Sequence, residues 1–143
     1  MRNAASADYD RIAPLVDEWW GGRQMIDMLP RLFFVHFSET AFVAEDGDDL
    51  CGFLAGFLSQ SKPDEAYIHF VGVNPAHRAA GVGRSLYEQF FAAVEPRTTV
   101  RCVTAPVNER SVAFHQAMGF EIERIDDDYD GAGEARVLLV KKL

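Results

Sequence analysis

The sequence predicts a mixed α/β domain spanning residues 1–143. This length is typical of a single domain, and a content of 48% hydrophobic and 25% charged residues is typical of a packed core. Apolar residues alternate with period two in several short runs and recur at four-residue spacing in others, and turn-forming clusters separate the two kinds of run. Strands and helices are therefore expected to alternate along the chain.

Two helical stretches are expected before the first long strand. An extended start over residues 1–5 precedes the first stretch, residues 8–20, which Pro14 is expected to kink or split. The second stretch covers residues 23–36 and is expected to be interrupted near Pro30.

The rest of the chain alternates between strand and helix patterns. The turn-forming runs DGDD and SKPDE separate three strands that follow one another directly. Leu86, Phe90 and Val94 mark one face of a helix, and Gly119 is the expected stop of the last helix. The expected elements are strands at residues 40–45, 50–60 and 66–73, a helix at 82–95, a strand at 98–105, a helix at 108–118, and strands at 120–125 and 135–143.

The net charge of −8 argues against nucleic acid as a partner, because proteins that neutralise phosphates present a basic face. The charge is unevenly distributed. Residues 121–134 carry seven acidic side chains and one basic one, whereas residues 78–101 carry four arginines and two glutamates. One part of the surface can therefore attract an anion while another repels it.

Cys51 and Cys102 lie in apolar runs and are expected to be buried, reduced thiols, with a disulfide or a nucleophilic role as the alternative. No Cys/His cluster has the spacing of metal ligands, so no metal is expected. The chain has no apolar run long enough to span a membrane, and its start lacks the apolar centre of a signal peptide. A cytoplasmic location with no membrane partner is therefore expected.

The stretch NPAHRAAGVGRS, residues 74–85, is the first pointer to function. It lacks the spacing of a P-loop, and Leu86 stands where a dinucleotide fingerprint needs a third glycine. What remains is the pattern Arg78-x-x-Gly81-x-Gly83 between a strand and a helix. Glycines let the backbone approach an anion closely, and a helix N-terminus attracts one. A tight turn without a ligand and a phosphate cradle both fit this pattern.

Two motifs carry a family resemblance. VGVNPAHRAAGVGRSLYEQF resembles the acyl-CoA-binding motif of the GNAT superfamily of N-acetyltransferases, with the pattern Val-x-Pro-x-x-Arg/Gln-x-x-Gly-x-Gly/Ala. NERSVAFHQAMGF resembles the second motif of that family, in which an Asn opens a helix that ends at Met/Leu-Gly-Phe. The resemblance implies a GNAT-like acyltransferase domain over residues 1–143, with a central, mostly antiparallel sheet, a splayed parallel pair of strands, and helices on both faces. The pattern positions of the first motif are Val73, Pro75, Arg78, Gly81 and Gly83.

The resemblance also implies acetyl-CoA as co-substrate. Backbone N–H groups of residues 78–85 are implied to hold its pyrophosphate, and a backbone N–H near Val71 to polarise the thioester carbonyl. For Asn108 a helix N-cap is the alternative, and one residue can do both. The implied cofactor-binding residues are Val71, Gly72, Val73, Arg78, Ala79, Ala80, Gly81, Val82, Gly83, Arg84, Ser85, Asn108, Ser111 and Phe114.

In this family an amine attacks the thioester directly, without a covalent acyl-enzyme. A lysine-like amine is neutral in roughly one molecule of 2,500 at pH 7, so a positioned base is useful. Many relatives have Glu where this chain has His69, and Tyr where it has His115. His69 is therefore a candidate base and the His115 imidazolium a candidate acid for the departing thiolate. For His69 the alternative is a packed or hydrogen-bonding residue, and for His115 a solvated position without catalytic use.

The resemblance places two segments around the acceptor, the one between the early helices and the loop between the last strands. They contain Trp19 and Trp20, and Asp126, Asp127 and Asp128. Aromatic rings beside carboxylates suit an organic cation, so the expected acceptor is a positively charged amine on a small molecule or peptide. The alternative is that the tryptophans belong to the core and the acidic loop is merely solvated.

The expected function is thus the transfer of an acetyl group from acetyl-CoA to a primary amine, with a homodimer as the family habit. A non-catalytic acyl-CoA-binding or interaction module is one alternative, because His replaces both usual proton-transfer residues. Transfer of a longer acyl group is another, which the space near Leu54, Phe57 and Phe70 would decide.

Overall fold

The computed structural model describes residues 1–143. Seven strands form one sheet in the order β1-β2-β3-β4-β5-β7-β6. The chain forms two compact units, Met1–Phe57 with Ile68–Glu95 (unit 1) and Leu58–Tyr67 with Pro96–Leu143 (unit 2). The elements are β1 (Arg2–Asn3), α1 (Ser6–Trp19), η1 (Ile26–Met28), α2 (Leu32–Val35), η2 (Ser38–Thr40), β2 (Ala41–Asp46), β3 (Asp49–Leu58), β4 (Glu65–Val73), η3 (Pro75–Ala80), α3 (Val82–Ala93), β5 (Thr99–Thr104), α4 (Glu109–Ala117), β6 (Glu121–Asp126) and β7 (Arg136–Lys142), where η marks a 3₁₀ helix.

The predicted class and order of elements are confirmed. The second helical stretch is interrupted near Pro30 as expected, since η1 ends at Met28, α2 begins at Leu32, and Leu29 before Pro30 is not helical, with a φ of −124° and a ψ of 78°. The expected split at Pro14 is wrong, since α1 runs through it from Ser6 to Trp19.

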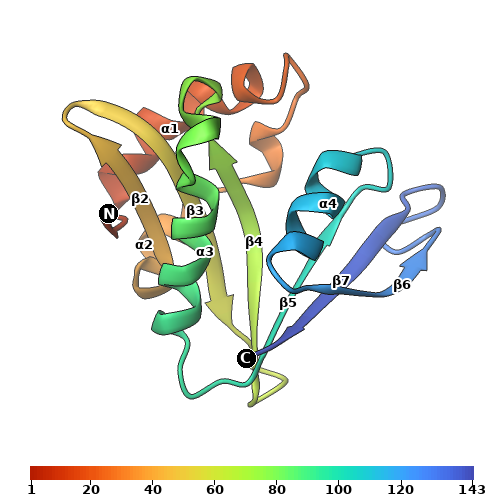
Figure 1. The fold of residues 1–143 in the computed structure, drawn as a ribbon. Coiled ribbons are helices and arrows are strands. Elements are labelled where there is room, and N and C mark those ends of the chain that lie inside the picture. The colour runs from red at the N-terminus through yellow and green to blue at the C-terminus, as the bar shows by residue number, and fades with distance from the viewer. The chain divides into compact units, whose positions relative to one another are not determined.

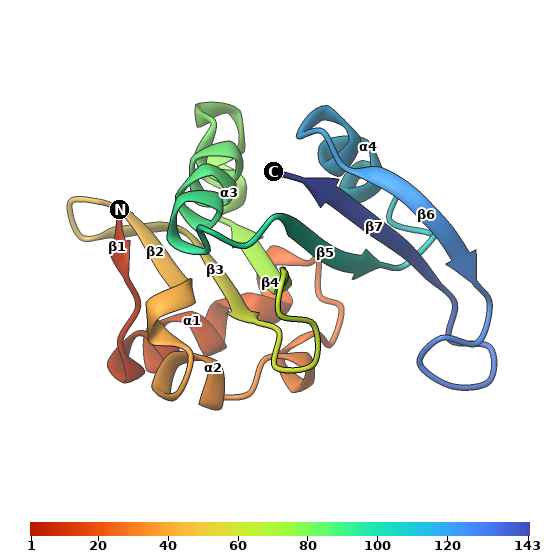
Figure 2. The same cartoon turned by 90° about the horizontal axis from the view of Figure 1, so that it is seen from below.

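Helices cover both faces of the strands in unit 1, as β3 shows residue by residue. A Cβ added at Gly52 would meet Val82 at 3.0 Å and Leu86 at 3.2 Å, both on α3. The next side chain, Phe53, stacks instead on Trp19 of α1, with 6.2 Å between the ring centroids. Successive strand residues point to opposite faces, so α3 covers one face and α1 the other, as Figures 1 and 2 show.

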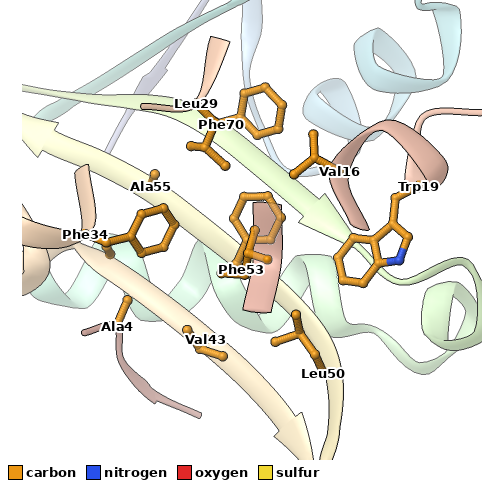
Figure 3. Packing of buried hydrophobic residues seen from close by; sticks show 12 residues of the cluster. Ala4, Val16, Trp19, Leu29, Phe34, Val43, Leu50, Phe53, Ala55 and Phe70 are labelled. Atoms are coloured by element: carbon orange, nitrogen blue, oxygen red, sulfur yellow. The ribbon is translucent and has the colours of Figure 1, made fainter. Parts of the chain in front are cut away.

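Aromatic side chains fill the core between α1, α2 and the sheet. Phe53 is fully buried at its centre, with ring centroids 6.4 Å from Phe34 and 5.9 Å from Phe70 (Figure 3). Ile12, Val16 and Trp19 of α1 are all buried in the same cluster. Each such large apolar side chain contributes about 1.5–3 kcal/mol of burial, so this cluster holds the α1–α2 segment on the sheet.

Strand pairing defines unit 2. The first three residues of β4, Glu65–Tyr67, pair in parallel with Thr99–Arg101 of β5, while β5 with β7 and β6 with β7 pair antiparallel. The predicted parallel pair in a mostly antiparallel sheet is thus confirmed. Arg97 ties the turn before β4 together by donating to the carbonyls of Ser59, Lys62 and Glu65.

Both cysteines are buried, free thiols, as predicted. Burial raises the pKa of Cys102 to about 12 and also raises the pKa of Cys51. Neither is therefore a thiolate at neutral pH, which removes the nucleophile alternative. None of the helices has the length and apolar character required to cross a membrane.

Candidate functional site

The turn between β4 and α3 begins at Asn74, which anchors it to β3. Its backbone N–H donates to the Cys51 carbonyl at 2.8 Å, and its side-chain amide donates to the Leu50 carbonyl at 3.0 Å. Its Oδ1 accepts from the N–H of Ala76 at 3.0 Å and so caps η3. The sequence prediction missed this role, although Asn directly before Pro75 is a typical helix-start signal.

Gly81 gives the turn its open end. Its φ of 74° lies in the left-handed region, and no atom lies within 4 Å of where its Cβ would be. The first hydrogen bond of α3 runs from Ser85 N–H to the Gly81 carbonyl at 3.1 Å. The N–H groups of Val82, Gly83 and Arg84 therefore have no acceptor within the helix, and no acidic residue stands in the first turn. This arrangement suits an anion.

The side chain of Arg78 forms a hydrogen bond within unit 1. Its guanidinium donates to the Trp19 carbonyl at 3.0 Å, one of the carbonyls that a helix leaves without a partner at its C-terminal end. A second side chain of the turn, His77, contacts the Asp49 carboxylate at 2.6 Å. The turn is thus fastened to α1 on one side and to the β2–β3 hairpin on the other.

Gly72 is needed for packing. A Cβ there would lie 2.4 Å from the Phe53 ring and 3.0 Å from the Trp20 ring. These distances are too short for any side chain at this position. Val71 and Val73, on either side, are half-buried. The glycine thus lets two aromatic rings approach β4, and its assignment as a cofactor contact stays a prediction.

The two tryptophans have different surroundings. Trp19 is 6% exposed and stacks on Phe53 in the core, which favours the core alternative for its ring. Trp20 is half-buried, and its ring centroid lies 4.9 Å from that of Phe70 on β4. Helical spacing does not separate the two, because Trp19 and Trp20 stand seven and eight residues after the buried Ile12, but α1 ends at Trp19 and Trp20 is its C-cap.

His69 lies against the α1–α2 segment. Its Nε2 is 2.5 Å from the Met28 carbonyl, and its ring stacks on Phe33 with 4.4 Å between centroids and 7° between planes. A carbonyl can only accept a hydrogen bond, so Nε2 carries a proton and donates it. In the neutral ring, Nδ1 is then the nitrogen that can accept a proton.

Burial alternates along β4, whereas contacts with the α1–α2 segment do not. Ile68, Phe70 and Gly72 are buried, whereas Tyr67, His69, Val71 and Val73 are half-buried. Yet His69 and Phe70, successive residues, both contact rings of the α1–α2 segment, Phe33 and Trp20. Side chains of two successive β4 residues therefore contact the same segment.

In unit 2, α4 starts with its own cap. Asn108 Oδ1 accepts from the Ser111 N–H at 3.2 Å, which is the N-cap alternative for Asn108. His115 lies one turn after Ser111 and is 7% exposed. Its Nδ1 donates to the Ser111 carbonyl at 2.7 Å. Burial lowers the pKa of His115, and the bond to Ser111 offsets this only in part. The ring is therefore neutral at pH 7, which speaks against the expected imidazolium acid.

The acidic loop between β6 and β7 is organised by its own carboxylates. Asp126 accepts from the N–H of Asp128 at 3.1 Å, and Asp128 accepts from the N–H of Gly133 at 2.9 Å. Asp127 is exposed, and Arg136 pairs with Asp130 at 2.8 Å. Two of the three candidate acceptor carboxylates thus shape the loop itself.

The candidate residues fall into two sets. Unit 1 brings His69, Trp20, Val71, Val73 and the turn of residues 78–85 together on β4, α1 and α3. Unit 2 contains Asn108, Ser111, Phe114 and His115 on α4, and the three aspartates of the loop. The set in unit 1 combines a strand-to-helix turn whose helix start suits an anion with a histidine on the preceding strand.

The sequence profile of the acetyltransferase (GNAT) family matches residues 6–120. The chain therefore belongs to the GNAT family. The L-2,4-diaminobutyric acid acetyltransferase of Nocardia farcinica is 31% identical over 84 residues, which are 57% of this chain and 44% of that protein. The chain spans about half the length of the curated relatives it matches.

Solved structures share the fold. Naa20 of Chaetomium thermophilum, in complex with a bisubstrate analogue, has a TM-score of 0.82 and 23% identity, covering 99% of this chain and 85% of that one. The diaminobutyrate acetyltransferase EctA of Paenibacillus lautus, in complex with L-2,4-diaminobutyric acid and coenzyme A, has a TM-score of 0.74 and 17% identity, covering 98% and 92%. These likenesses confirm the GNAT-like fold expected from the two motifs.

Proposed function

We propose that this chain is an N-acetyltransferase that uses acetyl-CoA to acetylate a primary amine. The observation that carries the proposal is the start of α3 in a chain of the GNAT family. There Gly81 opens the turn, and the N–H groups of Val82, Gly83 and Arg84 have no acceptor in the helix. The pyrophosphate of CoA is an anion of the kind that such a helix start binds. Val71 is kept as the residue whose backbone polarises the thioester.

His69 is the proposed base for the attacking amine. Because Nε2 donates to the Met28 carbonyl, the proton of the amine goes to Nδ1, directly or through one water molecule. Stacking on Phe33 fixes the plane of the ring, and a fixed plane orients the accepting lone pair. The thiolate of CoA leaves without a protein acid in this proposal, because His115 is a neutral, buried ring.

The proposed acceptor is a small or peptidic amine that carries positive charge. The matched relative of Nocardia farcinica is named for L-2,4-diaminobutyric acid, a small amine, and the exposed Asp127 offers negative potential in this chain. Trp20, rather than Trp19, is the tryptophan kept as an acceptor contact, because only its ring is part-exposed. The cytoplasmic location and the homodimer stay predictions.

The test is an assay of thiol release. The full chain is incubated with acetyl-CoA and each of three probes: L-2,4-diaminobutyrate, a short peptide with a free N-terminus, and a neutral hydroxylated acceptor. Release of CoA thiol that needs an amine supports the proposal. Calorimetric binding of acetyl-CoA without turnover of any amine supports the non-catalytic module instead. Faster turnover with a longer acyl-CoA would point to the longer-acyl transferase.

A His69→Gln variant tests the base. The Gln side-chain amide can still donate to the Met28 carbonyl, so the contact is kept while the titratable nitrogen is lost. We expect kcat to fall by about 100-fold and the pH–rate profile to lose the rise that a general base produces. The exposed His36 provides the control variant, His36→Gln. An unchanged profile in His69→Gln would reject the role.

A further inference from the structure

Asp17 lies in the last turn of α1, where a carboxylate is unfavourable by itself, because the C-terminal end of a helix carries partial negative charge. The structure offsets this with two backbone donors. Asp17 Oδ1 accepts from the N–H of Met25 at 2.7 Å and from the N–H of Ile26 at 2.9 Å. Its own carbonyl accepts from the N–H of Gly22 at 2.8 Å. Asp17 therefore binds both ends of the loop that follows α1.

The middle of the loop has no buried side chain, although Trp20, Met25 and Ile26 pack partly against the core. Gln24 Nε2 also donates to Asp27 Oδ2 at 3.0 Å. Gly21, Gly22, Arg23 and Gln24 are exposed, and both glycines have positive φ, 69° and 89°. The next fully buried side chain is Leu29. Ordering an exposed loop costs backbone entropy, and the two hydrogen bonds that Asp17 accepts help to offset this cost.

The segment that Asp17 orders touches both parts of the proposed site. Arg78 of the anion-accepting turn donates to the Trp19 carbonyl, two residues after Asp17. His69 donates to the Met28 carbonyl, two residues after Ile26. The contacts of Asp17 lie between these two, so the hydrogen bonds connect the turn, the α1–α2 segment and His69 within unit 1.

We propose that Asp17 is a positioning residue for the acceptor: its carboxylate sets the conformation of residues 20–28, and thereby the place of Trp20 and of the Met28 carbonyl that holds His69. The proposal rests on the proposed acetyltransferase function. It assigns Asp17 no contact with the reacting atoms, and it predicts that acceptor use, rather than cofactor binding, depends on this carboxylate.

Two substitutions separate positioning from charge. Asp17→Asn keeps an oxygen that accepts the same N–H groups, whereas Asp17→Ala removes it. In Asp17→Ala we expect the KM for L-2,4-diaminobutyrate, or for the amine of the panel that is turned over fastest, to rise by about tenfold or more. The Kd of acetyl-CoA should stay within about twofold, and Asp17→Asn should restore most of the loss. Glu18→Ala, which removes the neighbouring exposed acid, is the matched control.

Trypsin gives a readout that needs no acceptor. Arg23 lies in the loop, so Asp17→Ala should be cleaved after Arg23 at least about tenfold faster than wild type, as expected when a loop opens locally, while Asp17→Asn and Glu18→Ala behave as wild type. Equal losses in acetyl-CoA affinity and acceptor KM would overturn the proposal, as would an Asn variant as impaired as the Ala variant, which would indicate a direct charge contact. If wild type acetylates no amine, the proposed function fails, and the cleavage rates still decide whether Asp17 holds the loop.

Discussion

The helices α3 and α4 begin in opposite ways. α4 begins with Asn108, whose side chain accepts from Ser111 N–H, and with Glu109 in its first turn. α3 begins with Gly81, has no side-chain cap and no acid in its first turn, and follows a 3₁₀ helix whose last turn contains basic residues. One helix satisfies its own N-terminus and the other leaves it open.

The difference indicates that the start of α3 lacks stabilising features that the start of α4 has. A helix cap is worth about 1 kcal/mol, and an acid in the first turn adds about 0.3–1 kcal/mol. α4 has both features, and α3 has neither. The N-terminus of α3 has no acceptor within its own helix for its first N–H groups. An anionic ligand could accept these hydrogen bonds, and this is the role proposed for acetyl-CoA.

The largest effect is expected from Gly81→Val, which gives the turn a β-branched residue at a φ of 74°. The left-handed region disfavours such a residue by about 1–2 kcal/mol, and the new side chain enters the open space in front of α3. We expect the Kd of acetyl-CoA, measured by calorimetry, to rise at least about 100-fold, roughly 2.7 kcal/mol.

Gly47→Val is the matched control for that variant. Gly47 has a φ of 61° and open space at its Cβ, but it lies in the β2–β3 hairpin and does not begin a helix. It should lower the melting temperature to a similar extent and leave acetyl-CoA binding within about twofold. Equal effects of both variants on binding would mean that the turn at Gly81 is only a turn.

The sequence predicted those parts of the molecule that local patterns determine. Periodicity located the strands and helices, and the spacing of Arg78, Gly81 and Gly83 located the turn. Positive φ at Gly81 could be expected because few other residues adopt it. The two helix starts could be told apart as well, since Asn108 is a typical cap and Gly81 has no side chain.

The contacts of the α1–α2 segment could not be predicted in the same way. Asp17 accepts from backbone N–H groups eight and nine residues along the chain, and the Met28 carbonyl accepts from His69, 41 residues away. No spacing rule specifies which backbone groups a loop will present. Loops depend on tertiary packing, which single-sequence patterns do not contain. An acid at the C-terminal end of a helix, followed by two glycines, was a signal that could have marked Asp17.

A charge reversal at each helix start sharpens the comparison. Arg84→Glu places an acid in the first turn of α3, where Glu109 stands in α4. The helix dipole should make the variant more stable by about 0.3–1 kcal/mol, while repulsion of the pyrophosphate should weaken acetyl-CoA binding about tenfold, more at low salt. Binding and stability thus change in opposite directions, which thermal unfolding and calorimetry at two salt concentrations can measure.

Arg110→Glu makes the same change of charge in the first turn of α4, at an exposed residue. It should alter acetyl-CoA binding by less than about threefold, because the start of α4 already has its own cap and acid and is not the proposed pyrophosphate site, and exposed charges are screened by salt. If both reversals weaken binding equally, the effect comes from the total charge of the protein and not from the open N-terminus of α3.

The smallest effect is expected at the cap of α4. Asn108→Ala should lower the free energy of unfolding by about 1 kcal/mol, whereas Asn108→Ser, which can also cap, should lower it by a few tenths. If Asn108 acts only as a cap, the Kd of acetyl-CoA stays within about threefold in both variants. If the residue also contacts the cofactor, as the family resemblance implies, Asn108→Ser binds acetyl-CoA as poorly as Asn108→Ala while remaining the more stable protein. Chemical unfolding and calorimetry on the same two variants therefore decide whether Asn108 only caps α4 or also binds acetyl-CoA.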